Sequence, residues 1–445
     1  MMEDKLINIA QGKQRHEMHA SEAVFEQEMD KVFGRCWLFL THESLIPNFG
    51  DYVVTRMGTD EVIVSRQRDG SIKAFLNTCR HRGAQLCPNE AGNARGFVCA
   101  YHGWAYGSNG DLQSVPFDEQ LYDGLLDKCK NSLHEVAKID SFYGFIYGCF
   151  DQDAPSLPDY LGDVKWYLEP YMDLSGGVEL IGPPGRCLIA ANWKTPSENF
   201  VGDAYHVGWT HSSALRSGGS IFSPLAGNSV LPPEGAGLQI TSKHGSGLGV
   251  LWDAYAGVHD GELANELMAF GLAKEQRLIK EIGAERARIY RSHLNGTIFP
   301  NNSFLTCSGI FKAWQPRSAN STEVFSWVMV EKDMPSDLKE AFTKSVHRTF
   351  GVAGYWESDD NDNMESETYM AKGHQAKKKM LNSQMGISGD RIDSDLPGVV
   401  GKSAIGETSY RGYYRFYGDL MGSDSWAEVS AKGDNWQDQL IKATV

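Results

Sequence analysis

Two short cysteine–histidine clusters constrain this chain more than any other feature of its 445 residues. The first is Cys79-Arg-His81 and the second is Cys99-Ala-Tyr-His102, with a gap of seventeen residues between them. Two thiolates and two imidazoles at these spacings predict that two loops close on one metal centre. Each of the two motifs supplies one Cys and one His. This ligand set fits the iron–sulfur cluster in which two His replace two Cys on one iron. Such ligation raises the reduction potential, which suits a one-electron relay.

A structural zinc site is the alternative interpretation of the same four residues. Zinc ribbons usually use pairs of cysteines two to four residues apart, whereas this chain has Cys-x-His pairs, so the cluster is favoured. The other cysteines show no paired spacing, and we expect them to pack as small apolar side chains: Cys36, Cys87, Cys129, Cys149, Cys187 and Cys307.

The pattern of turns and apolar residues predicts two domains behind an N-terminal helix. Ser21 can cap a helix that ends near Gly34. Short strands with tight turns, such as the Asp69-Gly70 turn, then indicate a small β domain. Beyond the proline-containing stretch 153–158, helices are expected over 262–290 and after Pro335, and a strand over 323–330. We therefore expect an α+β protein, divided into an N-terminal helical segment, an all-β domain and a larger α+β domain at residues 1–37, 38–156 and 157–445.

The segment 192–211 is the second place where chemistry is expected. If it is helical after Pro196, then Asn199, Asp203 and His206 share one face, because they stand at i, i+4 and i+7. A relay alone would not need the roughly 290 residues that follow the β domain, so the reaction should take place here.

A second histidine, His211, lies five residues beyond His206, an offset that leaves the shared face of a regular helix. We therefore expect the helix to bend or end near Gly208, so that both imidazoles can hold one metal. Two His and one distant carboxylate form the facial triad of non-heme Fe(II) oxygenases, which leaves metal positions open for dioxygen.

Spacing alone leaves the identity of the carboxylate open. Several acidic residues crowd a predicted helix start behind Ser358, where the helix dipole favours negative charge. For most of this run we expect a capped, solvated helix start. The candidates are Glu357, Asp359, Asp360 and Asp362.

Taken together, the two motifs resemble those of Rieske non-heme iron ring-hydroxylating dioxygenases, and the chain resembles the large catalytic α subunit of the naphthalene dioxygenase group. Respiratory Rieske proteins carry an extra disulfide between the two loops, whereas this chain has Ala84 and Tyr101 at the matching places. The similarity extends along nearly the whole chain and includes Pro397–Arg411. The stretch Trp356–Met364 is similar to the carboxylate segment of the group, and the resemblance implies Asp360 as the third iron ligand.

The resemblance implies an all-β Rieske domain inserted before a catalytic domain with an antiparallel sheet and surrounding helices, of helix-grip type. It implies two cofactors, a [2Fe-2S] cluster and a mononuclear Fe(II), with O2 as co-substrate. Asp203 would bridge His102 of one chain and His206 of the next, with Asn199 beside it. The cluster ligands would be Cys79, His81, Cys99 and His102; the mononuclear iron ligands would be His206, His211 and Asp360.

The same resemblance implies the partners and the reaction. NADH would supply electrons through a flavin reductase and a small ferredoxin, and a small β subunit would complete an α3β3 hexamer. The Gly-rich run Gly245–Gly249 lacks the strand-then-helix context of a dinucleotide site, which agrees with indirect use of NADH. Arg80, Arg82 and Arg95 lie near the cluster motifs and could steer an acidic ferredoxin.

The expected product is a cis-dihydrodiol, formed from a polycyclic arene such as naphthalene or phenanthrene in an apolar pocket. Phe350 is expected to decide which ring edge faces the iron. A Rieske monooxygenase acting on a substituted arene such as salicylate, a Rieske electron carrier and a zinc-stabilised binding module are the competing functions. The expected pocket residues are Asn199, Phe200, Ala204, Val207, Val258, His293, Asn295, Leu305, Thr349, Phe350 and Trp356.

Charge and hydropathy exclude several other functions. The 57 acidic residues outnumber the 42 Lys and Arg residues, which gives a net charge of −15, so nucleic acid and anionic membranes are poor partners. The longest nearly apolar stretch, 142–150, has nine residues, whereas a membrane span needs about 20. We expect a cytoplasmic bacterial protein.

Overall fold

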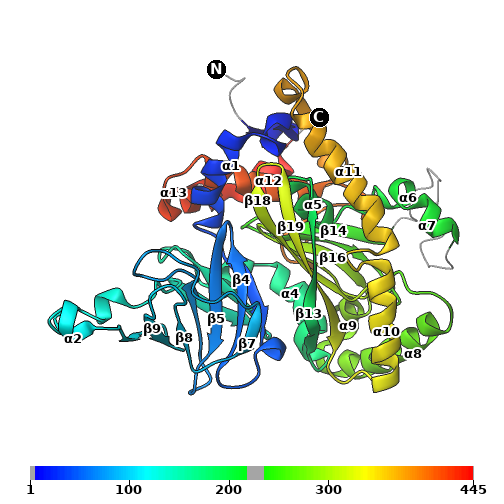
Figure 1. Cartoon of the computed structure of the whole chain (residues 1–445). Coiled ribbons are helices and arrows are strands. Elements are labelled where there is room, and N and C mark those ends of the chain that lie inside the picture. The colour runs from blue at the N-terminus through cyan, green and yellow to red at the C-terminus, as the bar shows by residue number, and fades with distance from the viewer. Residues whose placement is uncertain (1–5, 218–234, 444–445) are drawn as a thin grey trace. The chain divides into compact units, whose positions relative to one another are not determined.

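The computed structural model describes residues 6–217 and 235–443. The chain divides into two compact units, one formed by Phe33–Leu157 and the other by Met1–Val32 together with Pro158–Val445 (Figure 1). Within the described residues, no helix is both long enough and apolar enough to cross a membrane.

The smaller unit consists of three antiparallel sheets. Its core surrounds Cys79 and Cys99 and includes Phe97, Trp104 and Tyr106. The sheets have the strand orders β6-β5-β4-β7, β10-β9-β8 and β11-β12-β3. Their strands are β3 (Leu38–His42), β4 (Asp51–Met57), β5 (Asp60–Arg66), β6 (Ile72–Leu76), β7 (Ala91–Asn93), β8 (Gly96–Val98), β9 (Ala105–Gly107), β10 (Leu112–Ser114), β11 (Lys138–Phe142) and β12 (Phe145–Cys149).

A nine-stranded antiparallel sheet dominates the larger unit, in the order β13-β19-β18-β17-β16-β15-β14-β22-β21. Its strands are β13 (Val178–Ile189), β14 (Gly237–Thr241), β15 (Gly247–Leu251), β16 (His293–Ile298), β17 (Asn302–Leu305), β18 (Ile310–Ser318), β19 (Ser321–Glu331), β21 (Arg391–Ile392) and β22 (Val399–Val400). A separate small sheet joins β1 (Ile7–Asn8), β2 (Lys13–Arg15) and β20 (Met380–Asn382).

Helices pack against this large sheet: α5 on β16 and β17, α10 on β19, and α12 on β14 and β15. The site residues come mainly from α5, α6 and α11. Within residues 6–217 and 235–443, the α-helices are α1 (Glu22–Glu28), α2 (Asp118–Leu121), α3 (Leu157–Leu161), α4 (Val164–Glu169), α5 (Lys194–Phe200), α6 (Val207–Thr210), α7 (Ser212–Ser217), α8 (Gly261–Ile282), α9 (Ala284–Tyr290), α10 (Ser336–Thr349), α11 (Tyr355–Ala371), α12 (Thr408–Met421), α13 (Trp426–Lys432) and α14 (Trp436–Ile441).

Several elements predicted from sequence are confirmed. Ser21 caps α1 by accepting a hydrogen bond from the Val24 N–H at 3.4 Å. The Asp69-Gly70 turn joins β5 to β6, and α10 begins directly after Pro335. The helix expected over 262–290 is interrupted at Gly283, whose positive φ of 82° separates α8 from α9.

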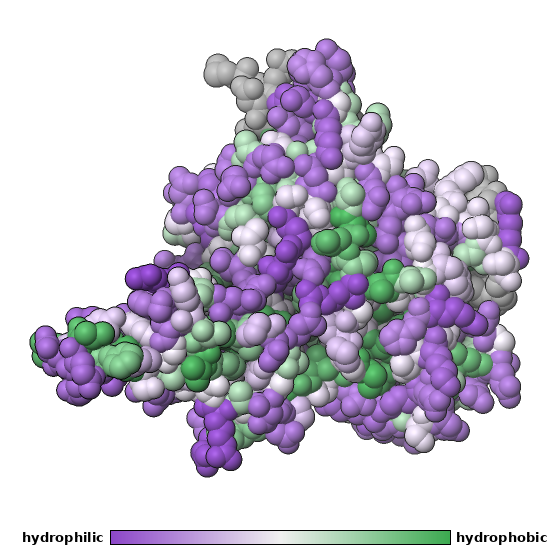
Figure 2. Space-filling model, viewed as in Figure 1, coloured by the Kyte–Doolittle hydropathy of each residue, from purple (hydrophilic) through white to green (hydrophobic). Residues whose placement is uncertain are grey.

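The visible surface is largely hydrophilic, as the negative mean hydropathy requires (Figure 2). Apolar side chains are nevertheless exposed around α2, where Phe117, Leu121 and Leu125 are 67, 74 and 83% accessible. Cys129 is exposed as well, so the expectation that every cysteine outside the two motifs packs in the interior is wrong for this residue.

Candidate metal centres and substrate pocket

The two Cys–His motifs occupy loops of the same construction. In each loop the cysteine carbonyl accepts a hydrogen bond from a glycine four residues later: Gly83 N–H to Cys79 and Gly103 N–H to Cys99, both at 2.9 Å. Both glycines have positive φ, 70° and 71°, which glycine adopts without strain. The local sequence therefore folds two loops of matching backbone geometry.

The cysteines of the two loops belong to one buried core cluster, and the histidines of the two loops lie side by side. Cys79 and Cys99 are buried, and the Nδ1 atoms of His81 and His102 lie 3.2 Å apart. The His81 ring stacks on Trp104, with ring centroids 5.1 Å apart, which fixes its orientation. Two buried thiols and two imidazoles that turn the same ring nitrogen toward each other are the donor set that a Cys2His2 iron–sulfur cluster requires.

The second histidine pair lies at the two ends of a single helical turn. His206 is the N-cap and His211 the C-cap of α6, and their ring centroids are 5.2 Å apart. The prediction was one helix that bends or ends near Gly208. A helical turn does end close to Gly208, at Thr210, but it is the separate helix α6, so the expectation of one continuous helix from Pro196 is wrong. The preceding helix α5 ends at Phe200, and the chain turns at Gly202, whose φ is 129°.

Close packing explains why the turn falls at Gly202. A Cβ atom there would lie 2.7 Å from the Gly249 backbone nitrogen and from the Ser409 Oγ, so no side chain fits. The break brings Asp203 beside His206, but the two residues do not share one continuous helical face with Asn199, as the spacing had suggested.

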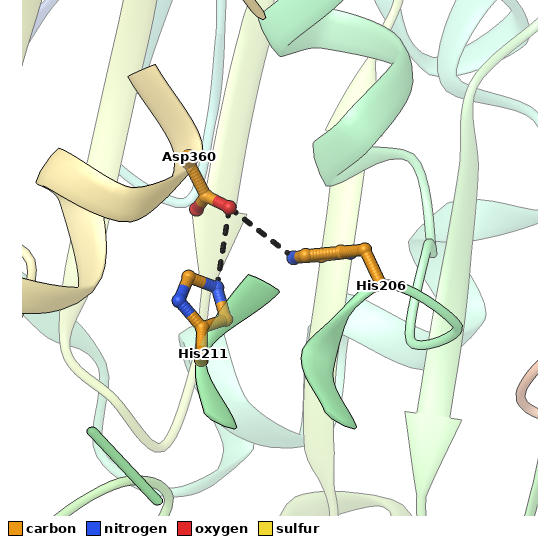
Figure 3. Close-up of side chains that lie close together, drawn as sticks. All are labelled: His206, His211 and Asp360. Atoms are coloured by element: carbon orange, nitrogen blue, oxygen red, sulfur yellow. Dashed lines mark ion pairs between the residues drawn. The ribbon is translucent and has the colours of Figure 1, made fainter. Parts of the chain in front are cut away.

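Asp360, on α11, completes a three-residue group with the two histidines (Figure 3). Its Oδ1 lies 3.3 Å from His206 Nε2 and 3.1 Å from His211 Nε2. This oxygen is buried and has no hydrogen-bond partner among the described residues, although two imidazole nitrogens face it. Three donors converge without satisfying one another, so the group fits a bound cation.

The electrostatics of the group agree with this interpretation. Burial alone would raise the pKa of Asp360, yet the imidazoles of His211 and His206 hold it below its usual value. Burial likewise opposes the charged form of His206, but the carboxylates of Asp203 and Asp360 raise the pKa of this imidazole well above its usual value. The carboxylates therefore create a negative potential that favours a cation at this position, and a metal ion would replace the proton on the His206 imidazole.

Asp203 positions His206 through its carboxylate. The Oδ2 atom lies 3.2 Å from His206 Nδ1, while Oδ1 accepts the backbone N–H groups of Tyr205 and His206 at 2.8 and 3.2 Å. The Asn199 side-chain nitrogen lies 3.5 Å from the same Nδ1. A histidine whose Nε2 faces the metal position thus has its other nitrogen held by a carboxylate, as metal-ligating histidines usually do.

The expectation of a capped, solvated helix start at residues 357–362 is wrong in two respects. Helix α11 begins at Tyr355, and the Ser358 hydroxyl donates to the Gly354 carbonyl at 3.0 Å instead of capping the helix. Glu357 is buried and forms an ion pair with Lys312, also buried. Periodicity could not show this, because the cation comes from a strand 45 residues away.

An apolar cavity adjoins the His206, His211 and Asp360 side chains. It includes ten of the eleven residues expected from sequence, with Asp203 in addition. Thr349 is the exception: it is buried, but its hydroxyl donates to the Ser345 carbonyl at 2.9 Å and it does not line the cavity. Leu251 and Ile405 also line the cavity and were not expected. The lining residues are Asn199, Phe200, Asp203, Ala204, His206, Val207, His211, Leu251, Val258, His293, Asn295, Leu305, Phe350, Trp356, Asp360 and Ile405.

An all-β unit with a Cys2His2 set and an antiparallel-sheet unit with a 2-His-1-carboxylate group define the class of Rieske non-heme iron oxygenases. Comparison with known families agrees. Residues 36–131 match the Rieske [2Fe-2S] domain, and residues 157–423 match the catalytic domain of the ring-hydroxylating alpha subunit. The chain belongs to the family of ring-hydroxylating dioxygenase α subunits.

Individual relatives cover almost the entire chain. It is 64% identical over 432 residues to the large oxygenase component of the naphthalene 1,2-dioxygenase system of Pseudomonas aeruginosa, which covers 97% of this chain and 96% of that protein. It is 55% identical over 445 residues to the large oxygenase component of the 2,4-dinitrotoluene dioxygenase system of Burkholderia sp. (strain RASC), covering 100% and 98% of the two chains. The crystal structure of a naphthalene 1,2-dioxygenase variant bound to phenanthrene matches with a TM-score of 0.97 and 62% identity, over 99% of each chain.

These findings confirm the predicted fold class and the predicted enzyme class. The protein is an oxidoreductase, the oxygenase component of a Rieske non-heme iron dioxygenase, and its cofactors are a [2Fe-2S] Rieske cluster and a mononuclear iron, with O2 as co-substrate. As a large oxygenase component it belongs to a system of several components.

Proposed function

We propose that this α subunit adds both atoms of O2 to a polycyclic aromatic hydrocarbon, with a cis-dihydrodiol as the product. One observation carries the proposal: the apolar, aromatic-lined cavity adjoins the His206, His211 and Asp360 side chains. A flat apolar substrate would be held there by ring contacts and by exclusion of water.

In this proposal the residues of the two centres have separate roles. Cys79, His81, Cys99 and His102 hold the cluster, and the triad of His206, His211 and Asp360 holds the mononuclear iron. The iron, when bound, supplies the open coordination positions at which O2 is activated. Electrons reach the cluster one at a time from NADH, through a reductase and a ferredoxin that Arg80, Arg82 and Arg95 could help to orient.

Asp203 and Asn199 are the proposed positioning residues. Asp203 would link His102 of one subunit to His206 of the next, which requires an assembly of several α subunits, with three small β subunits in an α3β3 hexamer. Its present contacts support half of this role, because its carboxylate already holds the Nδ1 of His206. Asp203→Ala is expected to keep both metals and to lose turnover.

The pocket supports polycyclic arenes as the substrate class. Phe350 and Trp356 lie with ring centroids 5.7 Å apart, and Trp356 contacts the His211 ring at 4.6 Å, so an aromatic wall leads to the proposed iron ligands. Naphthalene and phenanthrene are the first candidates, given the relatives described above. Phe350→Val should change which ring edge is oxidised, because it removes part of this wall without touching a ligand.

The test is to supply ferredoxin, reductase and NADH to the purified oxygenase and to offer arenes under 18O2. Naphthalene, phenanthrene and 2,4-dinitrotoluene would be compared, with products identified by mass spectrometry. A diol carrying two labelled oxygen atoms is the expected result. A product that carries one labelled atom with every arene would contradict dioxygenation.

A further inference from the structure

A second group of ionisable side chains lies near the proposed iron site, on the wall of a cavity that His206 and Asp360 also line. Its residues come from four separate segments of the chain. His19 Nε2 lies 3.3 Å from Glu198 Oε2, 3.0 Å from the Tyr414 hydroxyl and 3.6 Å from Glu367 Oε1. Tyr414 also donates to Glu198. We call His19, Glu198, Glu367, Tyr410 and Tyr414 the carboxyl network. None of these residues is required by the cluster, the iron ligands or the pocket as described above.

The network holds a proton at neutral pH. Burial raises the pKa of Glu198 to about 8. Burial and then the nearby charge of Glu198 raise the pKa of Glu367 to about 7. His19 is buried, and burial lowers its pKa, so the imidazole is neutral. Two carboxyls that cannot both ionise share a proton, and they titrate as a pair.

Charged groups on every neighbouring element contribute to this balance. Glu198 is hydrogen-bonded by Tyr414 and by Tyr410, and Tyr410 accepts from the Gln14 side chain at 2.6 Å. Lys194 pairs with Glu28 at 2.6 Å and lies close enough to lower the pKa of Glu198. The titratable groups outside the network that face it are His16, Glu28, Lys194, Asp203, Glu407 and Tyr417.

The donors of the network could hold a cation, since the three ligand atoms of His19, Glu198 and Glu367 lie within 4.8 Å of one another. Two features favour a proton instead. The Lys194 ammonium already supplies positive charge beside them, and the Glu198 Oε2 that faces His19 accepts the Tyr414 hydroxyl. A second cation would have to displace this hydrogen bond and approach an ammonium.

A polar cavity of about 240 Å³ connects the network with the iron site. Glu198, Glu367 and Tyr410 line it, and so do His206 and Asp360. A cavity of this size with polar walls has room for several water molecules, which could carry protons between the two groups.

The network also reaches toward solvent. The Glu367 side chain is 32% accessible, whereas that of Glu198 is 8% accessible. Glu367 stands seven residues after Asp360 on α11, so two turns of one helix separate the outer carboxyl from the proposed iron ligand. The arrangement runs from a partly exposed carboxyl, through a buried one, to the cavity beside the ligands.

We propose that the Glu198–Glu367 pair delivers protons from solvent to the active site through this cavity. The inference rests on the proposed function, because conversion of an arene and O2 to a dihydrodiol consumes two electrons and two protons. Each oxygen atom forms one C–O bond, the O–O bond breaks, and each oxygen accepts one proton. The reductase and ferredoxin supply the electrons, and the carboxyl pair passes the protons and is reprotonated from water.

The experiment compares Glu198→Gln and Glu367→Gln with the parent holoenzyme, using arene and O2 in single turnovers with prereduced protein. Gln keeps the size of the side chain but cannot release a proton. We expect the rate of diol formation to fall about a hundredfold for Glu198→Gln, the lower end of the range for assisted proton transfer. The solvent deuterium isotope effect should rise in both variants, and the pH dependence between about pH 7 and 8 should disappear.

Two controls separate proton delivery from structural damage. Glu198→Asp keeps a titratable carboxyl and should restore part of the rate and the pH dependence. Asp362→Asn removes an exposed carboxylate from α11, the helix that carries Glu367, and should match the parent. If Glu198→Gln and Glu367→Gln bind both metals and keep the parent isotope effect and pH profile, the proposal is wrong, whatever their rates. Failure of the parent to form any doubly labelled diol would instead refute the proposed function.

Discussion

The Lys312 ammonium and the Glu357 carboxylate form an ion pair with both side chains fully buried, at 0 and 1% accessibility. Lys312 comes from β18, and its Nζ lies 5.6 Å from the centre of the Phe200 ring. Glu357 belongs to the first turn of α11, one turn before Asp360. The pair therefore fixes the rotation of α11 at the residue that faces the two histidines.

Removal of one partner of this pair should be costly. Lys312→Met leaves the Glu357 carboxylate buried without its cation, and we expect the free energy of unfolding to fall by about 3–5 kcal/mol. Because α11 would no longer be held in place, less mononuclear iron should be bound. Urea unfolding and iron analysis measure the two effects. The double variant Lys312→Met/Glu357→Leu should recover most of the stability, and equal losses in the single and double variants would contradict this account.

Replacement of a proposed iron ligand should remove the mononuclear iron and leave the iron–sulfur cluster in place. Asp360→Ala removes a proposed ligand of the mononuclear iron, so about one iron per chain should be lost. The Cys79 and Cys99 loops belong to the other compact unit, and the visible spectrum of the reduced and oxidised cluster should be unchanged. Asp362→Asn, on the exposed side of the same helix, is the control. Loss of cluster absorbance together with the iron would show that the two centres do not form independently.

The turn at Gly202 should tolerate no side chain. Gly202→Ala places a Cβ 2.7 Å from the Gly249 nitrogen and imposes a positive φ on alanine, so we expect a loss of about 1–3 kcal/mol in stability. Since Asp203 follows directly, the contact between Asp203 and His206 should also be disturbed, and turnover should fall more than stability alone explains. Gly182→Ala is a matched control, because its φ is also positive but no atom lies within 4 Å of the added Cβ. Equal effects of both substitutions would point to backbone strain alone.

Local spacing predicted the two Cys–His loops and the His206–His211 pair, because each of these lies on one short segment. It left the carboxylate open, and only the family resemblance implied Asp360. The Cys79 and Cys99 loops and the His206–His211 pair are each defined within a few residues, and the structure brings each set together. The position of the helix break was not predictable in this way. It depends on the close approach of Gly202 to Gly249, from a strand nearly 50 residues later.

Burial was the other property that spacing could not supply. Acidic side chains near the start of α11 have the composition of a solvated helix end, yet Glu357 is buried because a strand supplies Lys312. The carboxyl network was missed for the same reason. Its histidine lies near residue 20, its carboxyls on α5 and α11 and its tyrosines on α12, and no local pattern joins these segments.

A buried histidine outside the active site should make stability depend on pH. His244 stacks on Tyr160, with ring centroids 5.4 Å apart, and its Nδ1 donates to the Tyr160 carbonyl at 3.2 Å. Burial, together with the nearby charge of Arg415, lowers the pKa of His244 to about 4. The folded protein therefore binds fewer protons than the unfolded chain between about pH 6.5 and 4, and stability must fall as the pH drops through this range. One such group changes the free energy of unfolding by up to about 1.4 kcal/mol per pH unit.

Urea unfolding at pH 7, 6 and 5 should show this loss of stability in the parent and a smaller loss in His244→Gln, whose amide can still donate to the Tyr160 carbonyl. His347→Gln, which removes an exposed imidazole from α10, is the control, and a parent slope that persists in His244→Gln would assign the pH dependence to other groups.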